Sequence, residues 1–177
     1  MTEQQEYRVL DTQGNVELRE YAPCVVADVV MSGSAEQAGS AAFQPLFQYI
    51  SGANRGAESL AMTAPVIQAP VIQAPGPSQE HVVAFVLPAS VDAESAPIPT
   101  DARVSVREMP ATLTAVSRYS GRWSQSSYDQ QVAALRAALA ADGLTPVSQP
   151  RFARFDPPFK PWFLRRNEVH IDVAESR

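Results

Sequence analysis

Apolar and polar residues alternate along two pairs of short runs, a pattern typical of strands with one buried face. The first pair covers residues 16–18 and 25–29, and the second covers residues 104–106 and 113–115. Further extended segments are expected at residues 7–11, 60–67, 81–87, 152–155 and 168–173. A turn over Gln13, Gly14 and Asn15 is expected to join the first of these to the strand that follows.

Apolar residues with helical spacing follow each pair of runs. In the second half they cover residues 128–139, and Ser127 with Gln130 predicts a capping box where this helix starts. In the first half they cover residues 43–50, and Pro45 is expected to kink the helix or mark its start. Each half of the chain therefore predicts two strands, one helix and two more strands.

The two halves are also similar in sequence, at a constant offset of 88 residues. VELREYAPCVVADVVMSGS, which starts at Val16, resembles VSVREMPATLTAVSRYSGR, which starts at Val104, and Arg19 matches Arg107. Both segments contain the same pair of alternating runs. We therefore expect each half to be one copy of the same structural unit.

The predicted fold class is α+β, with two copies of the unit related by a pseudo-twofold axis. One antiparallel sheet or distorted β-barrel flanked by two helices buries the apolar faces of these elements economically. A length of 177 residues suits one domain. We expect a single domain over residues 1–177, with repeats at roughly 7–87 and 103–173 and a linker at 88–102.

One segment is low in complexity, because APVIQ occurs at residues 64–68 and again at 69–73. Its prolines cannot donate hydrogen bonds to a neighbouring strand, so an extended edge or a protruding loop is expected. A local duplication explains the repeat. A polyproline site for a partner is the alternative, although it favours a three-residue period over the five-residue period found here.

Composition and charge limit the classes of partner. Hydrophobic residues make up 45% of the chain and charged residues 19%, which indicates a folded globular protein. The net charge of −5 argues against a nucleic-acid partner. The first thirty residues lack the pattern of a secretory signal, and no apolar run approaches the roughly 20 residues of a membrane span. We expect a cytoplasmic protein without an intrachain disulfide, since Cys24 is its one cysteine.

The sequence contains no motif of a familiar catalytic or metal-binding class. Its two histidines and one cysteine lie far apart, and the glycine motifs of nucleotide sites are absent. His170 and Asp172 could face the same side of a strand, but no nucleophile motif accompanies them. Acidic pairs such as Glu17 and Glu20 are expected to be solvated. These observations favour a binding surface over an active site.

Six blocks of the sequence together resemble the SOUL heme-binding family. They are FQPLFQYISGAN at 43–54, LAMTAPV at 60–66, FVLP at 85–88, SGRW at 120–123, DPPFKPW at 156–162 and RRNEV at 165–169. The resemblance implies a distorted β-barrel flanked by two helices. It also implies non-covalent binding of heme or a related tetrapyrrole in a shallow apolar groove beside the first helix, as a carrier or buffer.

The resemblance further implies which residues contact the ligand. They are Phe43, Leu46, Phe47, Ile50, Arg55, Met62 and Lys160. The apolar members would form the groove wall, although the same spacing is typical of a helix face in a protein core. The two basic members would contact the propionates. No dedicated axial ligand is expected, because His81 and His170 lie outside the segments that form the groove.

Two other functions stay open at this stage. The chain could bind other amphipathic small molecules, as similar bacterial effector-binding domains do, and a buried carboxylate facing the cleft would then favour cationic ligands. It could also process tetrapyrroles as an enzyme, although no residue is identified as a general base or as an oxygen-activating ligand.

Overall fold

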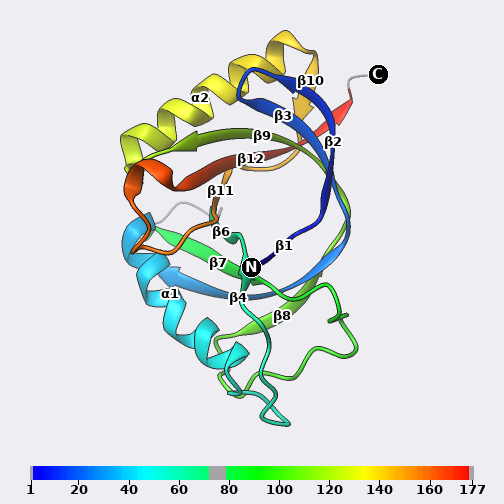
Figure 1. Ribbon diagram of the computed structural model, residues 1–177, viewed down its shortest axis with the longest axis vertical. Coiled ribbons are helices and arrows are strands. Elements are labelled where there is room, and N and C mark those ends of the chain that lie inside the picture. The colour runs from blue at the N-terminus through cyan, green and yellow to red at the C-terminus, as the bar shows by residue number, and fades with distance from the viewer. Residues whose placement is uncertain (1, 72–78, 176–177) are drawn as a thin grey trace. The chain divides into compact units, whose positions relative to one another are not determined.

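The computed structural model describes residues 2–71 and 79–175, which fold into two compact units (Figure 1). Unit 1 comprises Met1–Gln5 and Pro23–Pro110, and unit 2 comprises Glu6–Ala22 and Ala111–Arg177. Each unit has an antiparallel sheet with one α-helix packed on it. The predicted α+β class is confirmed.

Unit 1 contains a four-stranded antiparallel sheet covered by α1. The strand order is β6 (Val66–Pro70), β7 (Glu80–Val86), β4 (Cys24–Ser32) and β8 (Ser105–Met109). A short parallel pair, β1 (Glu3–Gln4) and β5 (Thr63–Ala64), also belongs to this unit. The helix α1 (Ala35–Ile50) packs on β4 and β7, and alternate apolar residues of these strands meet it in the core.

Unit 2 contains a larger antiparallel sheet covered by α2. The strand order is β2 (Tyr7–Gln13), β3 (Val16–Tyr21), β9 (Thr112–Ser120), β12 (Arg166–Glu175) and β11 (Arg151–Arg154), and β10 (Leu144–Pro146) also pairs with β12. The helix α2 (Gln125–Ala141) packs on β9 and β12 (Figure 1). A short 3₁₀ helix, η1 (Trp162–Leu164), precedes β12.

The strand pairings of the two units have the same register under the offset of 88 residues. Val25 of β4 lies opposite Glu108 of β8, and the equivalent residue of β9, Leu113, lies opposite Glu20 of β3. The first strand of each sequence repeat therefore pairs with the second strand of the other repeat. A duplication of the predicted kind requires such a common register.

The helix α1 begins earlier than the sequence pattern predicted. Its N-cap is Ser34, whose hydroxyl accepts a hydrogen bond from the Gln37 N–H at 3.3 Å. The Gln37 side chain accepts one from the Ser34 N–H at 3.0 Å, which completes a capping box. Pro45 therefore lies inside the helix and does not mark its start. Beyond the helix, Gly52 adopts a φ of 118°, a conformation that favours glycine.

The helix α2 also begins earlier, and the predicted capping box of Ser127 and Gln130 is wrong. The N-cap is Ser124, whose hydroxyl accepts a hydrogen bond from the Ser127 N–H at 3.1 Å. Several serines and amides precede the apolar face of this helix, so the sequence offered more than one start.

Part of the duplicated APVIQ segment lies in β6, which pairs with β7. Residues 72–78, which include the end of the second copy, lie outside the described residues. In the described part of the chain, neither α1 nor α2 has the length and apolarity required to span a membrane.

Candidate functional site

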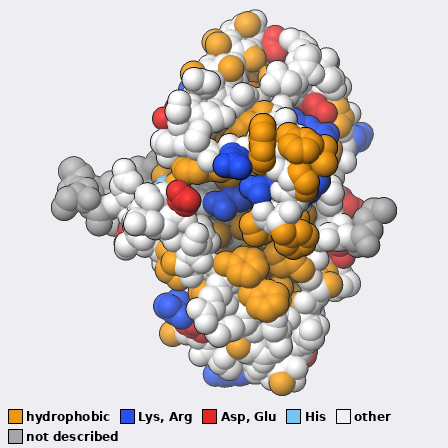
Figure 2. Space-filling view, turned by 60° about the vertical axis from the view of Figure 1, so that its left-hand side comes forward, with side chains coloured by type: hydrophobic (Ala, Val, Ile, Leu, Met, Phe, Trp, Pro, Cys, Tyr) orange, Lys and Arg blue, Asp and Glu red, His pale blue; other side chains and the backbone are white. Residues whose placement is uncertain are grey.

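Two phenylalanines stand on the exposed side of α1. Phe43 and Phe47 are one helical turn apart, and each side chain is 47% exposed. Their rings are stacked, with centroids 5.6 Å apart and planes inclined by 12°. Beneath them, the buried Phe85 of β7 meets Phe43 edge to face at 5.7 Å. Figure 2 views the side of the molecule that carries α1 and shows hydrophobic side chains gathered at its surface.

The side of α1 that faces the sheet, next to the two phenylalanines, belongs to the core of unit 1. Leu46 and Ile50 are also one turn apart, but they are only 0% and 4% exposed. Both residues are expected in the groove wall, and in the structure their side chains are covered by the sheet. Among the predicted apolar residues, Phe43, Phe47 and Met62 reach the surface.

Arg55 lies in an ordered loop after α1. The side-chain amide of Asn54 donates hydrogen bonds to the carbonyl oxygens of Tyr49 and Glu58, both at 2.9 Å, and fixes this loop to the helix end. The Arg55 N–H donates to the Ile98 carbonyl at 2.8 Å, while its side chain is exposed. The loop thus holds a solvent-facing guanidinium in unit 1, within a few residues of the end of α1.

Lys160 lies in unit 2 and is already paired. Its Nζ atom is 2.6 Å from a carboxylate oxygen of Asp156, and the other oxygen accepts the Arg166 N–H at 2.6 Å. Burial of Asp156 would raise the pKa of its carboxyl, but the hydrogen bonds from Arg166 and Lys160 outweigh burial and lower it. A ligand propionate at Lys160 would therefore compete with an ionised carboxylate.

The two histidines occupy different environments. His81 is half-buried on β7, where strand alternation places it on the same face as Val83 and Phe85, which pack in the core under α1. Burial lowers the pKa of His81. His170 is 1% exposed on β12, and burial also lowers its pKa. Of the two, His81 belongs to the same unit as α1, and His170 belongs to unit 2.

A buried ion network occupies the sheet face of unit 2 that is turned away from α2. The Glu168 carboxylate, which is 0% exposed, accepts hydrogen bonds from Arg19 at 2.9 and 3.0 Å and from Arg166 at 2.8 Å. Burial would raise the pKa of Glu168, but hydrogen bonds from His170 and Arg19 outweigh it and lower the pKa to about 2. Because this carboxylate is ionised, the His170 Nε2 atom, 2.7 Å away, carries the proton that they share.

His170 and Asp172 do lie on one face of β12, but they are not partners in a catalytic triad. Asp172 accepts two hydrogen bonds from Arg151, both at 2.8 Å, and one from the Thr114 hydroxyl at 2.7 Å. The His170 Nε2 atom is occupied by Glu168. Within residues 2–71 and 79–175, no group of three or more His, Cys, Asp or Glu side chains is placed to hold a metal ion.

Comparison with known families shows to which family the chain belongs. The model of the SOUL heme-binding protein family matches residues 2–172. The chain belongs to this family. Heme-binding protein 1 of Xenopus tropicalis is 27% identical over 155 residues, which cover 86% of this chain and 80% of that protein. Membership supports heme or tetrapyrrole binding in general and confirms heme as a candidate non-covalent ligand.

Solved structures share the fold of this SOUL family member at low sequence identity. The EcmrR C-terminal domain matches with a TM-score of 0.70 and 13% identity, over 96% of this chain and 99% of that one. The structure of SAV2435 bound to tetraphenylphosphonium matches with a TM-score of 0.53 and 13% identity, over 96% and 94% of the two chains. At these identities the matches show a common fold.

Sequence reasoning missed two features of this SOUL chain. Phe85 supports the exposed aromatic rings, and the alternation of β7 signals only that one of its faces is buried. Glu168 and Arg19 are 149 positions apart, so their contact depends on the fold. A signal for the network does exist, because charged or ionisable residues alternate along β12 at positions 166, 168, 170 and 172.

Proposed function

We propose that this chain binds heme or a related tetrapyrrole non-covalently against the exposed side of α1, as a carrier or buffer. The observation that carries the proposal is the stacked pair of half-exposed rings, Phe43 and Phe47, in a member of a heme-binding family. The exposed part of a large aromatic side chain is not buried within the protein and is available to a flat apolar ligand. Met62 is a further exposed apolar residue of the proposed site.

Apolar contact is expected to supply most of the affinity. A porphyrin offers several hundred Å² of apolar face, which corresponds to roughly 10 kcal/mol before the cost of association, at about 25 cal/mol per Å². An exposed ion pair between a propionate and an arginine adds only about 0–1 kcal/mol. Arg55 would therefore orient the ring rather than hold it. Lys160 is a weaker candidate for this role because it is paired with Asp156.

We further propose that the iron has no dedicated axial ligand from this chain. His170 is buried and hydrogen-bonded to Glu168, so coordination would require the ion network to open. His81 is half-buried, and its face of β7 is the one packed under α1. The chain's own residues thus bind and orient the macrocycle, while any iron chemistry is that of the heme.

The alternative of a receptor for lipophilic cations depends on a buried carboxylate. Glu168 is such a group, but Arg19 forms two hydrogen bonds with it and Arg166 a third. Its negative charge is therefore compensated within unit 2. A cationic ligand would need to displace a guanidinium from a buried site, which is costly. This observation favours the tetrapyrrole proposal over the alternative.

The decisive experiment is a pair of absorbance titrations, one with heme and one with metal-free protoporphyrin. Wild-type protein is expected to bind both with similar affinity. The double variant Phe43→Ser, Phe47→Ser is expected to bind both at least about tenfold more weakly. It removes two apolar contacts that together contribute roughly 1–2 kcal/mol to the binding free energy. Val147→Ala, at another exposed apolar position, is the matched control.

Three results would count against the proposal. Unchanged affinity in the double phenylalanine variant would remove the site from α1. A large preference for heme that His81→Ala abolishes would show an axial ligand. Turnover of bound heme in the presence of a reductant, detected by product analysis, would identify a processing enzyme in place of a carrier or buffer.

A further inference from the structure

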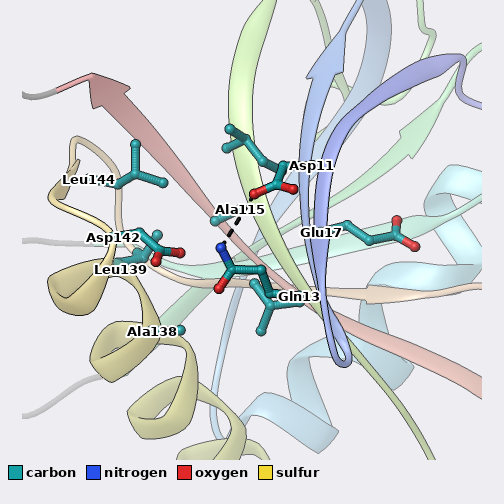
Figure 3. Close-up of a pocket in the computed structure, with 10 residues that line it drawn as sticks. Asp11, Gln13, Glu17, Ala115, Ala138, Leu139, Asp142 and Leu144 are labelled. Carbon is teal, nitrogen blue, oxygen red and sulfur yellow. Dashed lines mark hydrogen bonds between the residues drawn. The ribbon is translucent and has the colours of Figure 1, made fainter.

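A cavity lies in unit 2, between α2 and the sheet strands β2 and β3 (Figure 3). Its volume is about 300 Å³, at the lower end of the range for small-molecule sites. That volume suits a ligand with one ring and is too small for a tetrapyrrole. The cavity is separate from every residue of the proposed heme site, so an inference from it goes beyond the proposed function.

The inner surface of this cavity is apolar. It is formed by Val16 and Leu18 of β3, Ala115 of β9, Ala138 and Leu139 of α2, and Leu144 of β10. Ala115 and Leu139 belong to the buried core of the unit, so this surface is fixed by packing. A hydrocarbon ring placed here would leave water on contact with preformed apolar walls.

The rim of the cavity is negatively charged. Figure 3 shows the side chains of Asp11, Gln13 and Asp142 around the opening, whereas Glu17 points away from it. Glu17 is paired with Arg19 at 2.6 Å. Asp11 accepts hydrogen bonds from the Thr12 N–H and from the Gln13 amide, and within the described residues neither Asp11 nor Asp142 forms an ion pair.

The end of α2 adds to this negative potential. Asp142 is the C-cap of α2, and the last turn of the helix contains no basic residue to offset the partial negative charge of its carbonyl groups. Among the described residues, no lysine or arginine lines the cavity. The opening of this cavity thus combines an apolar interior with a negative rim. The rim carries two carboxylates without ion pairs and the C-terminus of a helix.

We propose that this cavity binds a small organic cation that carries one aromatic or compact aliphatic group, such as an aryl-alkyl ammonium. The apolar group fills the cavity between α2 and β3. The ammonium group stays at the rim, where Asp11, Asp142 and the helix end attract it and water still solvates it. An anionic ligand of the same shape is repelled.

The test uses 2-phenylethylammonium as the probe, with the neutral 2-phenylethanol and the anionic 3-phenylpropionate as isosteres. Binding to the ¹⁵N-labelled full chain is followed by amide chemical shifts at low salt. We expect a Kd of order millimolar for the cation, shifts confined to residues that line the cavity, about fivefold weaker binding of the alcohol and no binding of the acid.

Two pairs of variants locate the site. Ala138→Phe fills the cavity and is expected to abolish binding, whereas Ala140→Phe, on an exposed side of the same turn, leaves it unchanged. Asp142→Asn is expected to weaken binding up to about fivefold, and Asp129→Asn, at the other end of α2, to have no effect. If Ala138→Phe fails to fold, the comparison of Asp142→Asn with Asp129→Asn still tests the proposal, because both Asn variants are expected to preserve the fold.

Some outcomes overturn the proposal. These are equal affinity for the cation and the alcohol, shifts that map elsewhere, retained binding in a folded Ala138→Phe variant, or no binding at about 10 mM probe. Heme titration of the Asp142→Asn variant is expected to match wild type, so failure here is distinguishable from failure of the heme proposal.

Discussion

Glu168 shows how a single buried residue couples stability to pH. Its folded-state pKa of about 2 lies below its ordinary value of 4.5, because Arg19 and His170 bind the ionised form. The stabilisation is present above pH 4.5 and is lost as the pH falls toward 2. Burial keeps His170 neutral, so protonation of this residue in the unfolded chain adds to the loss below pH 6.5.

We therefore predict that the free energy of unfolding falls on acidification, with roughly 3 kcal/mol of the fall due to Glu168 between pH 4.5 and 2. Glu168→Gln should lower stability at pH 7, because the buried Arg19 loses its buried ionised partner and retains only Glu17, and should flatten this acid limb. Urea unfolding at several pH values measures both effects.

The control for this prediction is Asp101, whose pKa is also lowered to about 2, by hydrogen bonds from Arg103. Asp101 and Arg103 form their ion pair near the surface, where water screens it, so Asp101→Asn should leave the acid limb nearly unchanged. Equal flattening by the two variants would show that burial of Glu168 is not the cause.

At this same scale, spacing predicted that α1 is amphipathic but could not predict which of its apolar residues are exposed. Phe43 and Phe47 share one spacing with Leu46 and Ile50, yet the first two are half-exposed and the last two are buried. Burial depends on where β4 and β7 meet the helix, and those contacts are long-range. The family resemblance implied all four residues as ligand contacts. Only the packing of the helix on the sheet separates the two exposed residues from the two that belong to the core.

At the scale of elements, helix starts are decided by local hydrogen bonds that compete in the sequence. Ser124 caps α2 through its hydroxyl, and Ser127 contributes only its backbone N–H. We predict that Ser124→Ala lowers the free energy of unfolding by about 1 kcal/mol, the usual value of an N-cap serine. Ser127→Ala should change it by less than about 0.5 kcal/mol.

Thermal or urea unfolding of the two variants, with helix content followed by circular dichroism, distinguishes these caps. The pair is matched in chemistry and differs only in position. A larger loss for Ser127→Ala than for Ser124→Ala would show that the helix starts where the sequence pattern predicted, three residues later.

The strands were predictable because alternation is a local signal, but their pairing was not. Residues 16–18, 25–29 and 113–115 lie in strands, as predicted, and the strand predicted at 104–106 begins one residue later, at Ser105. The alternation does not say which strands are neighbours, and β3 pairs with β9, almost 100 residues away. The turn at Gly14, by contrast, is a local feature, and its φ of 63° suits glycine.

At the scale of the whole molecule, the first strand of each sequence repeat pairs with a strand of the other repeat. This pairing decides which part of the chain can fold by itself. Unit 2 takes β2 and β3 from residues 6–22, which lie between the two segments of unit 1, and the rest from residues that follow unit 1. The fragment 103–177 therefore lacks β3, the strand that pairs with β9, and Arg19, the buried partner of Glu168. We expect this fragment to be largely unfolded, because β9 loses a neighbouring strand and the buried Glu168 loses both hydrogen bonds from Arg19.

The register of these strands provides a direct way to restore the missing part. Tyr21 of β3 lies opposite Thr112 of β9, so the two strands can be joined as an antiparallel hairpin. A chain of residues 6–21, an Asn-Gly turn and residues 112–177 retains the core between α2 and the sheet and the whole ion network.

We predict cooperative thermal unfolding and dispersed amide spectra for this chain but not for fragment 103–177. In the same chain, Arg19→Met should abolish the transition, since an isolated unit has less stability to lose than the full protein. The variant leaves the buried Glu168 with only Arg166 and His170, and breaking a buried ion pair costs up to about 3–5 kcal/mol. A fragment 103–177 that folds cooperatively without residues 6–21 would contradict the argument, because it would show that β3 and Arg19 are not needed to complete the unit.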